Sequence, residues 1–94
     1  MKHHILVKWK KEYKDKINIE EIKSIFDKTL TINGVKNVEY IPNVIDRPNR
    51  YDLLIRIEME IDTLVVYDSS VYHKMWKEKY SDLIDSKAIF DSEF

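Results

Sequence analysis

The chain has no cysteine and only one glycine, and these absences exclude whole classes of site. Without cysteine there is no disulfide, no thiolate zinc site, no iron–sulfur cluster and no cysteine nucleophile. One glycine, Gly34, is too few for the glycine-rich loops that hold phosphates in P-loop and dinucleotide-binding proteins. We therefore predict that the protein uses no cofactor.

The sequence also lacks an excess of charge and a long apolar run. Sixteen basic and seventeen acidic side chains give a net charge of -1, so neither a nucleic acid nor a membrane is predicted as a partner. No stretch approaches the roughly 18 apolar residues of a membrane-spanning helix. The apolar run at residues 5–7 is too short for a signal peptide, and Lys8, Lys10 and Lys11 follow it. A cytoplasmic location is the resulting expectation.

With 94 residues and 44% hydrophobic side chains, the chain is predicted to form a single domain, 1–94, around one core. Strands are predicted at residues 3–10, 35–41, 51–60 and 88–92 from alternating or bounded apolar runs. A helix is predicted over 19–31, with Asn18 as its N-cap, Glu21 completing a capping box and Gly34 following its end. A second helical region starts at Asp62, as its cap, and breaks at residues 68–70. The order β-α-β-β-α-β predicts an α+β fold, a ferredoxin-like sandwich.

The alternation of the strands predicts one face under the helices and one without a layer. In the first strand His3, Ile5, Val7 and Trp9 share the inner face. The opposite face carries Leu6, Leu54 and Ile89 among charges, with Lys8 and Lys10 placed to pair with Glu58 and Glu60. Clustered apolar residues on such a face favour a homodimer that packs sheet on sheet. A monomer with a solvated sheet is the alternative.

Three segments resemble the stress-responsive A/B barrel domain family of dimeric α-β barrels: HHILVKWK at residues 3–10, INGVK at 32–36, and 73–91 ending in KAIFD. The resemblance covers the whole chain and implies a subunit whose sheet pairs with its mate's to form a barrel. Most members have no known activity. One branch holds a polyketide cyclase of the olivetolic acid cyclase type, in which a His and a Tyr form an acid–base pair.

By position, the resemblance places that pair at His73 and Tyr67 and a pocket histidine at His3. The sequence also departs from the cyclase pattern. Leu53 replaces a second pocket histidine, Ile25 replaces a pocket tyrosine, and Ser70-Val71 replaces a common His-Pro. Much of the cyclase's polar pocket is therefore missing.

Imidazole is the side chain whose ordinary pKa suits proton transfer near neutrality, so His73 is the candidate base. Tyr67 lies six residues earlier, and the two would diverge in one straight helix. They converge only if the break at 68–70 redirects the chain. The structural alternative has His73 on the surface and Tyr67 in the core.

The remaining predicted pocket residues also have a structural alternative, because a small core is built from the same side chains. The candidate ligand pocket is lined by His3, Ile5, Val7, Trp9, Leu53 and Trp76. No metal is predicted, because His3 and His73 lack a third ligand and His4 points away from His3. Two functions stay open: a small apolar ligand or stress role without catalysis, and a cyclase or lyase that uses His73 and Tyr67.

Overall fold

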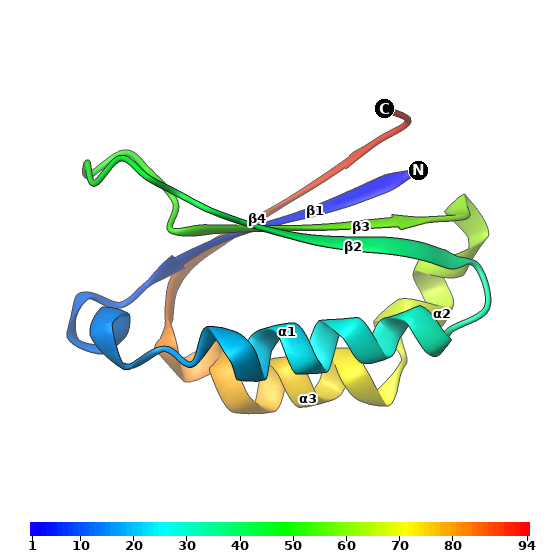
Figure 1. The fold of residues 1–94 in the computed structure, drawn as a ribbon, viewed down its shortest axis with the longest axis horizontal. Coiled ribbons are helices and arrows are strands. Elements are labelled where there is room, and N and C mark those ends of the chain that lie inside the picture. Colours follow the sequence, from blue (N-terminus) through cyan, green and yellow to red (C-terminus); the bar gives the residue numbers. More distant parts are fainter.

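A four-stranded antiparallel sheet carries two long helices on one face in the computed structural model, which describes residues 1–94 (Figure 1). The strand order is β2-β3-β1-β4. The strands are β1 (Lys2–Trp9), β2 (Val35–Pro42), β3 (Leu53–Met59) and β4 (Ile84–Ser92). The helices are α1 (Ile19–Asp27), α2 (Leu64–Asp68) and α3 (Val71–Tyr80). The predicted ferredoxin-like α+β fold is confirmed.

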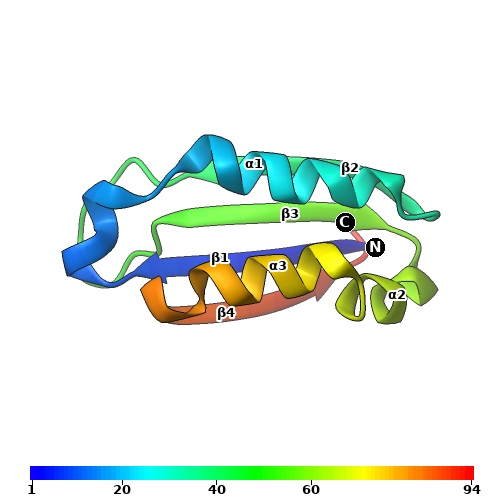
Figure 2. The ribbon, with the colours of Figure 1, turned by 90° about the horizontal axis from the view of Figure 1, so that it is seen from below.

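The helices on the covered face differ in length and position. Seen from the helix side, α1 and α3 lie along the strands, and the short α2 lies at one end of the sheet (Figure 2). The longest helix, α3, has 10 residues, and no helix has the length and apolar character to cross a bilayer. The opposite face of the sheet has no layer over it (Figure 1).

The predicted inner faces of the two central strands are confirmed. Burial alternates strictly along β1 and β3. Together with α1, α2 and α3 these strands form a core of 13 buried residues: Ile5, Val7, Trp9, Ile22, Ile25, Phe26, Leu53, Ile55, Ile57, Met59, Tyr67, Trp76 and Tyr80. The space between helices and sheet is filled by large side chains.

The predicted capping of α1 is confirmed in part. Asn18 caps the helix, since its side-chain oxygen accepts the Glu21 backbone N–H at 3.1 Å. The Glu21 carboxylate does not complete the capping box, because it accepts a hydrogen bond from the Tyr80 hydroxyl at 2.7 Å. The carboxylate thus joins α1 to α3 instead of closing its own helix.

Two predicted boundaries are wrong. Asp62 does not cap a helix, because Ile61–Thr63 forms a 3₁₀ turn with no side-chain cap. β4 begins at Ile84, four residues before the predicted strand at 88–92. As an edge strand, β4 lacks a buried alternation that could have marked its start.

Gly34 has a backbone that other residues avoid, with φ +100° in the turn before β2. A Cβ at this position would lie 2.1 Å from Oγ1 of the buried Thr63. Its carbonyl also accepts the Glu60 N–H at 2.9 Å, so the turn cannot shift freely. The glycine is required by backbone geometry and close approach.

Gly34→Ala is expected to lower the free energy of unfolding by about 1–3 kcal/mol, because it adds backbone strain and a steric clash. Urea unfolding followed by circular dichroism measures the change. Asn33→Ala, one residue earlier, is the matched control and is expected to change stability little. Equal stability of Gly34→Ala and the parent would contradict this explanation.

Candidate functional site

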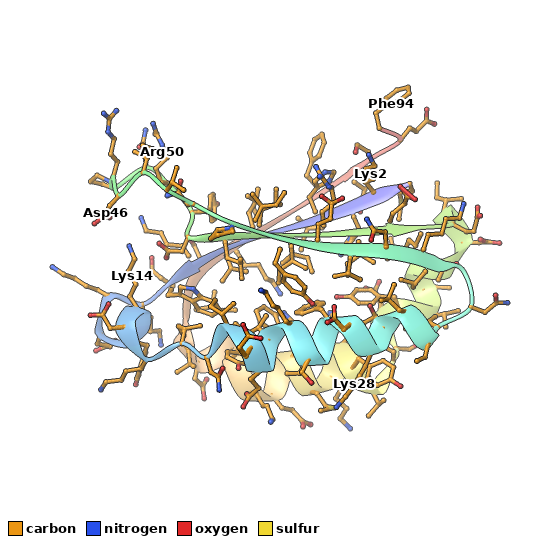
Figure 3. All side chains as sticks on the ribbon, in the orientation of Figure 1. Lys2, Lys14, Lys28, Asp46, Arg50 and Phe94 are labelled. Atoms are coloured by element: carbon orange, nitrogen blue, oxygen red, sulfur yellow. The ribbon has the colours of Figure 1, made fainter.

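An apolar row crosses the open face of the sheet. The register places Ile41 opposite Leu54, Leu54 opposite Leu6, and Leu6 opposite Ala88. Directly opposed residues of antiparallel strands point to the same side, so the row spans all four strands. Phe90 lies one row further along β4, opposite His4, and is 64% exposed. Side chains rise from this side around the labelled Lys2 (Figure 3).

The register corrects one member of the predicted face. Ile89 pairs with the buried Ile5, so it lies on the helix-covered side and not on the open face. Ala88 and Phe90 are the residues of β4 that face outward. Because side chains alternate, a strand placed one residue off inverts its faces.

The predicted pairs of Lys8 and Lys10 with Glu58 and Glu60 are also wrong. Because β1 and β3 are antiparallel, Glu58 lies opposite Lys2, at the far end of β1 from Lys8. Glu60 pairs instead with Lys36 at 2.8 Å.

The open face has an ion pair of its own between neighbouring strands. Arg56 Nη2 lies 2.6 Å from Glu39 Oε2. That hydrogen bond holds the pKa of Glu39 below its ordinary value. The apolar row is therefore flanked by a paired charge.

Tyr67, His73 and His3 come together at the end of the sheet where α2 lies. The ring centroid of Tyr67 lies 5.5 Å from that of His3 and 5.1 Å from that of His73. The break between α2 and α3 brings this about: Ser70 starts a new helix by accepting the His73 N–H at 3.2 Å. The structure thus meets the condition that the sequence set for the two side chains to converge.

Hydrogen bonds hold both imidazoles but not the phenol. His3 Nδ1 lies 2.5 Å from Asp91 Oδ1, which joins β1 to β4. His73 Nδ1 lies 2.9 Å from the Asp68 carbonyl oxygen, so it carries the proton and leaves Nε2 as the free base of a neutral ring. Tyr67 Oη is buried and has no hydrogen-bond partner in the protein. Buried polar atoms are usually satisfied, which makes this hydroxyl the exception in the fold.

Burial sets the protonation of two of these groups. It raises the pKa of the Tyr67 hydroxyl far above its ordinary value of 10.0, so the phenol stays protonated. It lowers the pKa of His73 from 6.5, against the opposing effect of the Asp68 carbonyl. At neutral pH the pair is a neutral base beside a neutral acid.

The pH dependence of stability is expected to report His73. Because the folded chain holds this pKa below 6.5, the unfolded chain binds the proton more tightly. The contribution of His73 to the free energy of unfolding is present above 6.5 and is lost as the pH falls through the lowered value. His73→Gln is expected to flatten the fall in stability between about pH 7 and pH 5. The comparison is made by urea unfolding at each pH; His3 and His4 remain in both chains, and identical slopes would contradict this expectation.

The predicted ligand-pocket residues lie in or at the edge of the core. His3, Ile5, Val7, Trp9, Leu53 and Trp76 are each at most 6% exposed. A surface depression includes His73 with residues of the α2–α3 break, but neither Tyr67 nor His3 lines it. The structure contains no group of three His, Asp or Glu side chains arranged to hold a metal ion.

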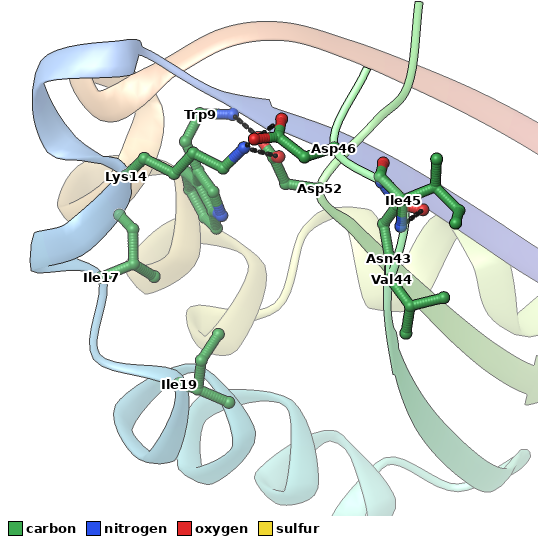
Figure 4. A pocket seen from close by; sticks show the side chains of 9 residues that line it. All are labelled: Trp9, Lys14, Ile17, Ile19, Asn43, Val44, Ile45, Asp46 and Asp52. Atoms are coloured by element: carbon green, nitrogen blue, oxygen red, sulfur yellow. Dashed lines mark hydrogen bonds and ion pairs between the residues drawn. The ribbon is translucent and has the colours of Figure 1, made fainter.

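A groove at the opposite end of the sheet was not expected from the sequence (Figure 4). It lies between the start of α1 and the loop that joins β2 to β3, and has a volume of about 330 Å³. Its lining residues are Trp9, Lys14, Ile17, Ile19, Asn43, Val44, Ile45, Asp46 and Asp52. Asp52 accepts the Trp9 backbone N–H at 2.8 Å and lies 3.1 Å from Lys14 Nζ. The only sequence signal was the apolar pair Val44-Ile45 inside a polar loop.

Solved structures share this fold. The protein At3g17210 of Arabidopsis thaliana superposes with a TM-score of 0.79 at 16% identity, covering 99% of this chain and 93% of that one. A Bacteroides fragilis protein described as dimeric, ferredoxin-like and of unknown function has a TM-score of 0.66 at 19% identity, covering 99% and 94%. A dabb family protein of Mesorhizobium loti with a ferredoxin-like fold has a TM-score of 0.66 at 14% identity, covering 97% and 92%. No protein-family model matches the chain, and no curated protein matches it.

Proposed function

We propose that the protein is a single-domain homodimer of the stress-responsive A/B barrel kind, and that its two sheets pack through their open faces. The apolar row of Ile41, Leu54, Leu6 and Ala88 carries this proposal, because it gives an unlayered sheet an apolar centre. Two observations on relatives in fold support it: the Bacteroides fragilis structure is described as dimeric, and the Mesorhizobium loti structure is of the dabb family.

Sedimentation analysis at micromolar concentration tests the dimer. The expected mass is twice the 11.4 kDa of one subunit, and it should persist on dilution to the low micromolar range. A mass of 11.4 kDa throughout would contradict the proposal.

In this proposal each subunit binds a small apolar ligand in a stress role without catalysis. The ligand contacts the rings of His3 and Tyr67 when the short α2 moves away from β1, because both rings are buried, and the other predicted lining residues form the core behind them. Nile red, a neutral apolar dye, is expected to bind saturably, and loss of the gene is expected to lower survival under stress. A protein that binds no apolar probe, together with unchanged survival, would contradict this part.

A second candidate function is a cyclase or lyase, and the unpartnered Tyr67 hydroxyl favours it. In this reaction His73 Nε2 takes a proton from an activated carbon or phenol of the substrate. The Tyr67 O–H donates a hydrogen bond to the substrate's carbonyl oxygen, and its raised pKa keeps the donor protonated. Because Tyr67 is fully buried, a substrate reaches the hydroxyl only when the five-residue α2 moves away from β1.

Hydrogen–deuterium exchange of carbonyl compounds with acidic α-hydrogens tests this second candidate. If the wild type catalyses exchange, His73→Gln and Tyr67→Phe are each expected to slow it by about 10²–10⁴-fold. Lys74→Gln is the matched control, because Lys74 is the exposed residue next to His73 in the chain. This variant should keep the wild-type rate. Catalysis that survives His73→Gln would assign the chemistry to other residues.

A further inference from the structure

The groove of Figure 4 is one half of a larger depression with two unlike halves. A second pocket of about 430 Å³ adjoins it and shares Trp9, Lys14, Asp46 and Asp52 with it. We call the first the apolar chamber, the second the basic chamber, and both together the terminal groove. His3 and Trp9 lie at opposite ends of β1, so the groove is about 20 Å from the Tyr67 cluster.

The apolar chamber leaves aliphatic side chains exposed, although such side chains are usually buried in a protein core. Five of its nine lining residues are apolar. Trp9 is 5% exposed and belongs to the core, whereas Ile19, Ile45 and Val44 are 38%, 45% and 87% exposed. Apolar surface gathered around a concave site is typical of a ligand-binding pocket.

The basic chamber has an excess of positive charge. It is lined by five cations, Lys8, Lys11, Lys14, Arg47 and Arg50, and by two carboxylates, Asp46 and Asp52. Both carboxylates are already engaged, because Lys14 Nζ lies 3.4 Å from Asp46 and 3.1 Å from Asp52. Asp52 also accepts the Trp9 N–H.

The other four cations have no acidic partner. Lys8 donates to the Pro48 carbonyl at 2.6 Å, and Arg50 donates to the Asn49 side chain at 2.6 Å. None of Lys8, Lys11, Arg47 or Arg50 takes part in an ion pair. Figure 3 shows Lys14, Asp46 and Arg50 together at this end of the molecule. Guanidinium groups bind carboxylates through two parallel hydrogen bonds, and neither Arg47 nor Arg50 has a carboxylate partner in the structure.

We infer that the terminal groove binds a small amphipathic carboxylate, with its alkyl chain in the apolar chamber and its carboxylate in the basic chamber. The charge of the basic chamber selects an anionic head, and the apolar lining next to it selects a chain attached to that head. The concave shape, floored by a buried tryptophan, fits a free molecule rather than a flat lipid surface. This site is separate from the Tyr67 cluster. Its edge meets the open face, because Lys8 shares a face of β1 with Leu6 and Arg50 also borders the depression lined by Leu6 and Leu54. Calorimetry measures ligand binding and sedimentation measures the dimer, so the two proposals can fail separately.

Titration calorimetry with decanoate on the full chain tests the site. Decanoate is expected to bind saturably, and octanoate more weakly by about fourfold for each methylene that is removed. Decanol, which keeps the chain without the charge, is expected to bind about tenfold more weakly than decanoate. Equal affinities for decanoate and decanol, or no saturable binding of decanoate, would overturn the inference.

Variants separate the two chambers. Arg50→Gln and Arg47→Gln are expected to weaken decanoate binding about threefold each, which together make up the tenfold advantage over decanol, and to leave decanol binding unchanged. Ile45→Ser is expected to weaken both. The matched control is Lys77→Gln, a cation exposed on α3 outside the groove, and it should change neither.

Two further measurements identify the site and the source of the ligand. Tyr67→Phe is expected to keep the wild-type decanoate affinity, so a loss there would place the ligand at the Tyr67 cluster and overturn the inference. Vesicles of neutral lipid with a fraction of anionic lipid are expected not to sediment the protein. Binding to vesicles without binding of decanoate in solution would mark the groove as a membrane-contacting surface, which also overturns it.

Discussion

A Leu54→Lys chain is expected to be monomeric under conditions where the wild type is a dimer. Leu54 lies on central strand β3, in the middle of the apolar row, between Ile41 and Leu6. In a two-fold interface the substitution buries a cation from each subunit, and a buried unpaired charge costs several kcal/mol. The dissociation constant is therefore expected to rise at least about a thousandfold. Sedimentation equilibrium over a dilution series measures it.

The matched control is Val65→Lys. Val65 is 70% exposed on α2, on the helical side of the molecule, and the same lysine there is expected to leave the mass at the dimer value. Circular dichroism should show both variants folded, because neither side chain belongs to the 13-residue core. A Leu54→Lys chain with the wild-type dissociation constant would place the contact between subunits elsewhere.

Trp76→Ala is expected to lower the free energy of unfolding by about 3–5 kcal/mol. The indole is 2% exposed, and its ring centroid lies 5.0 Å from that of Phe26, 5.1 Å from that of Tyr80 and 6.3 Å from that of Trp9. Removing it leaves a cavity between α1, α3 and the sheet. For a domain of this size the change is a large part of the total stability.

This variant separates the two interpretations of Trp76. A side chain that lines an open pocket can be truncated at small cost, because no cavity is created. Tyr72→Ala is the control on the same helix, since Tyr72 is only partly buried. A loss below about 1 kcal/mol in Trp76→Ala would contradict its role as a core residue. Urea unfolding of the three chains provides the comparison.

Local patterns were enough to predict the central part of the fold. Buried and partly exposed residues alternate along β1 and β3, because each strand has one face under the helices and one face without a layer. This alternation is visible in the sequence. Asn18 and Gly34 mark the ends of the first helical segment through a side-chain cap and a positive φ. Both features depend on residues that lie close together in the chain, so they can be predicted from a single sequence.

The wrong predictions concern features that are determined by pairing between strands far apart in the sequence. The face on which Ile89 lies depends on its register against β1, and the partner of Glu58 depends on strand direction. Neither follows from a pattern within one segment. The start of β4 was missed for a related reason: its one neighbour, β1, fixes where the strand begins.

The two candidate sites differ in how much of each could be predicted from the sequence. The meeting of Tyr67 and His73 could be stated as a condition on the break at residues 68–70, because both residues lie close in sequence. The terminal groove joins segments more than 30 residues apart, as the Lys14–Asp46 pair shows. Only the folded chain brings these residues together.

Intermolecular nuclear Overhauser effects test the packing of open face on open face most directly. The sample mixes chains that carry ¹³C-labelled methyl groups with unlabelled chains, and a filtered experiment detects only contacts between subunits. Cross-peaks are expected from the methyl groups of Leu6, Leu54 and Ala88, and none from Val65 or Val66 on α2. Cross-peaks confined to α2, or none at all, would contradict a dimer formed through the sheet.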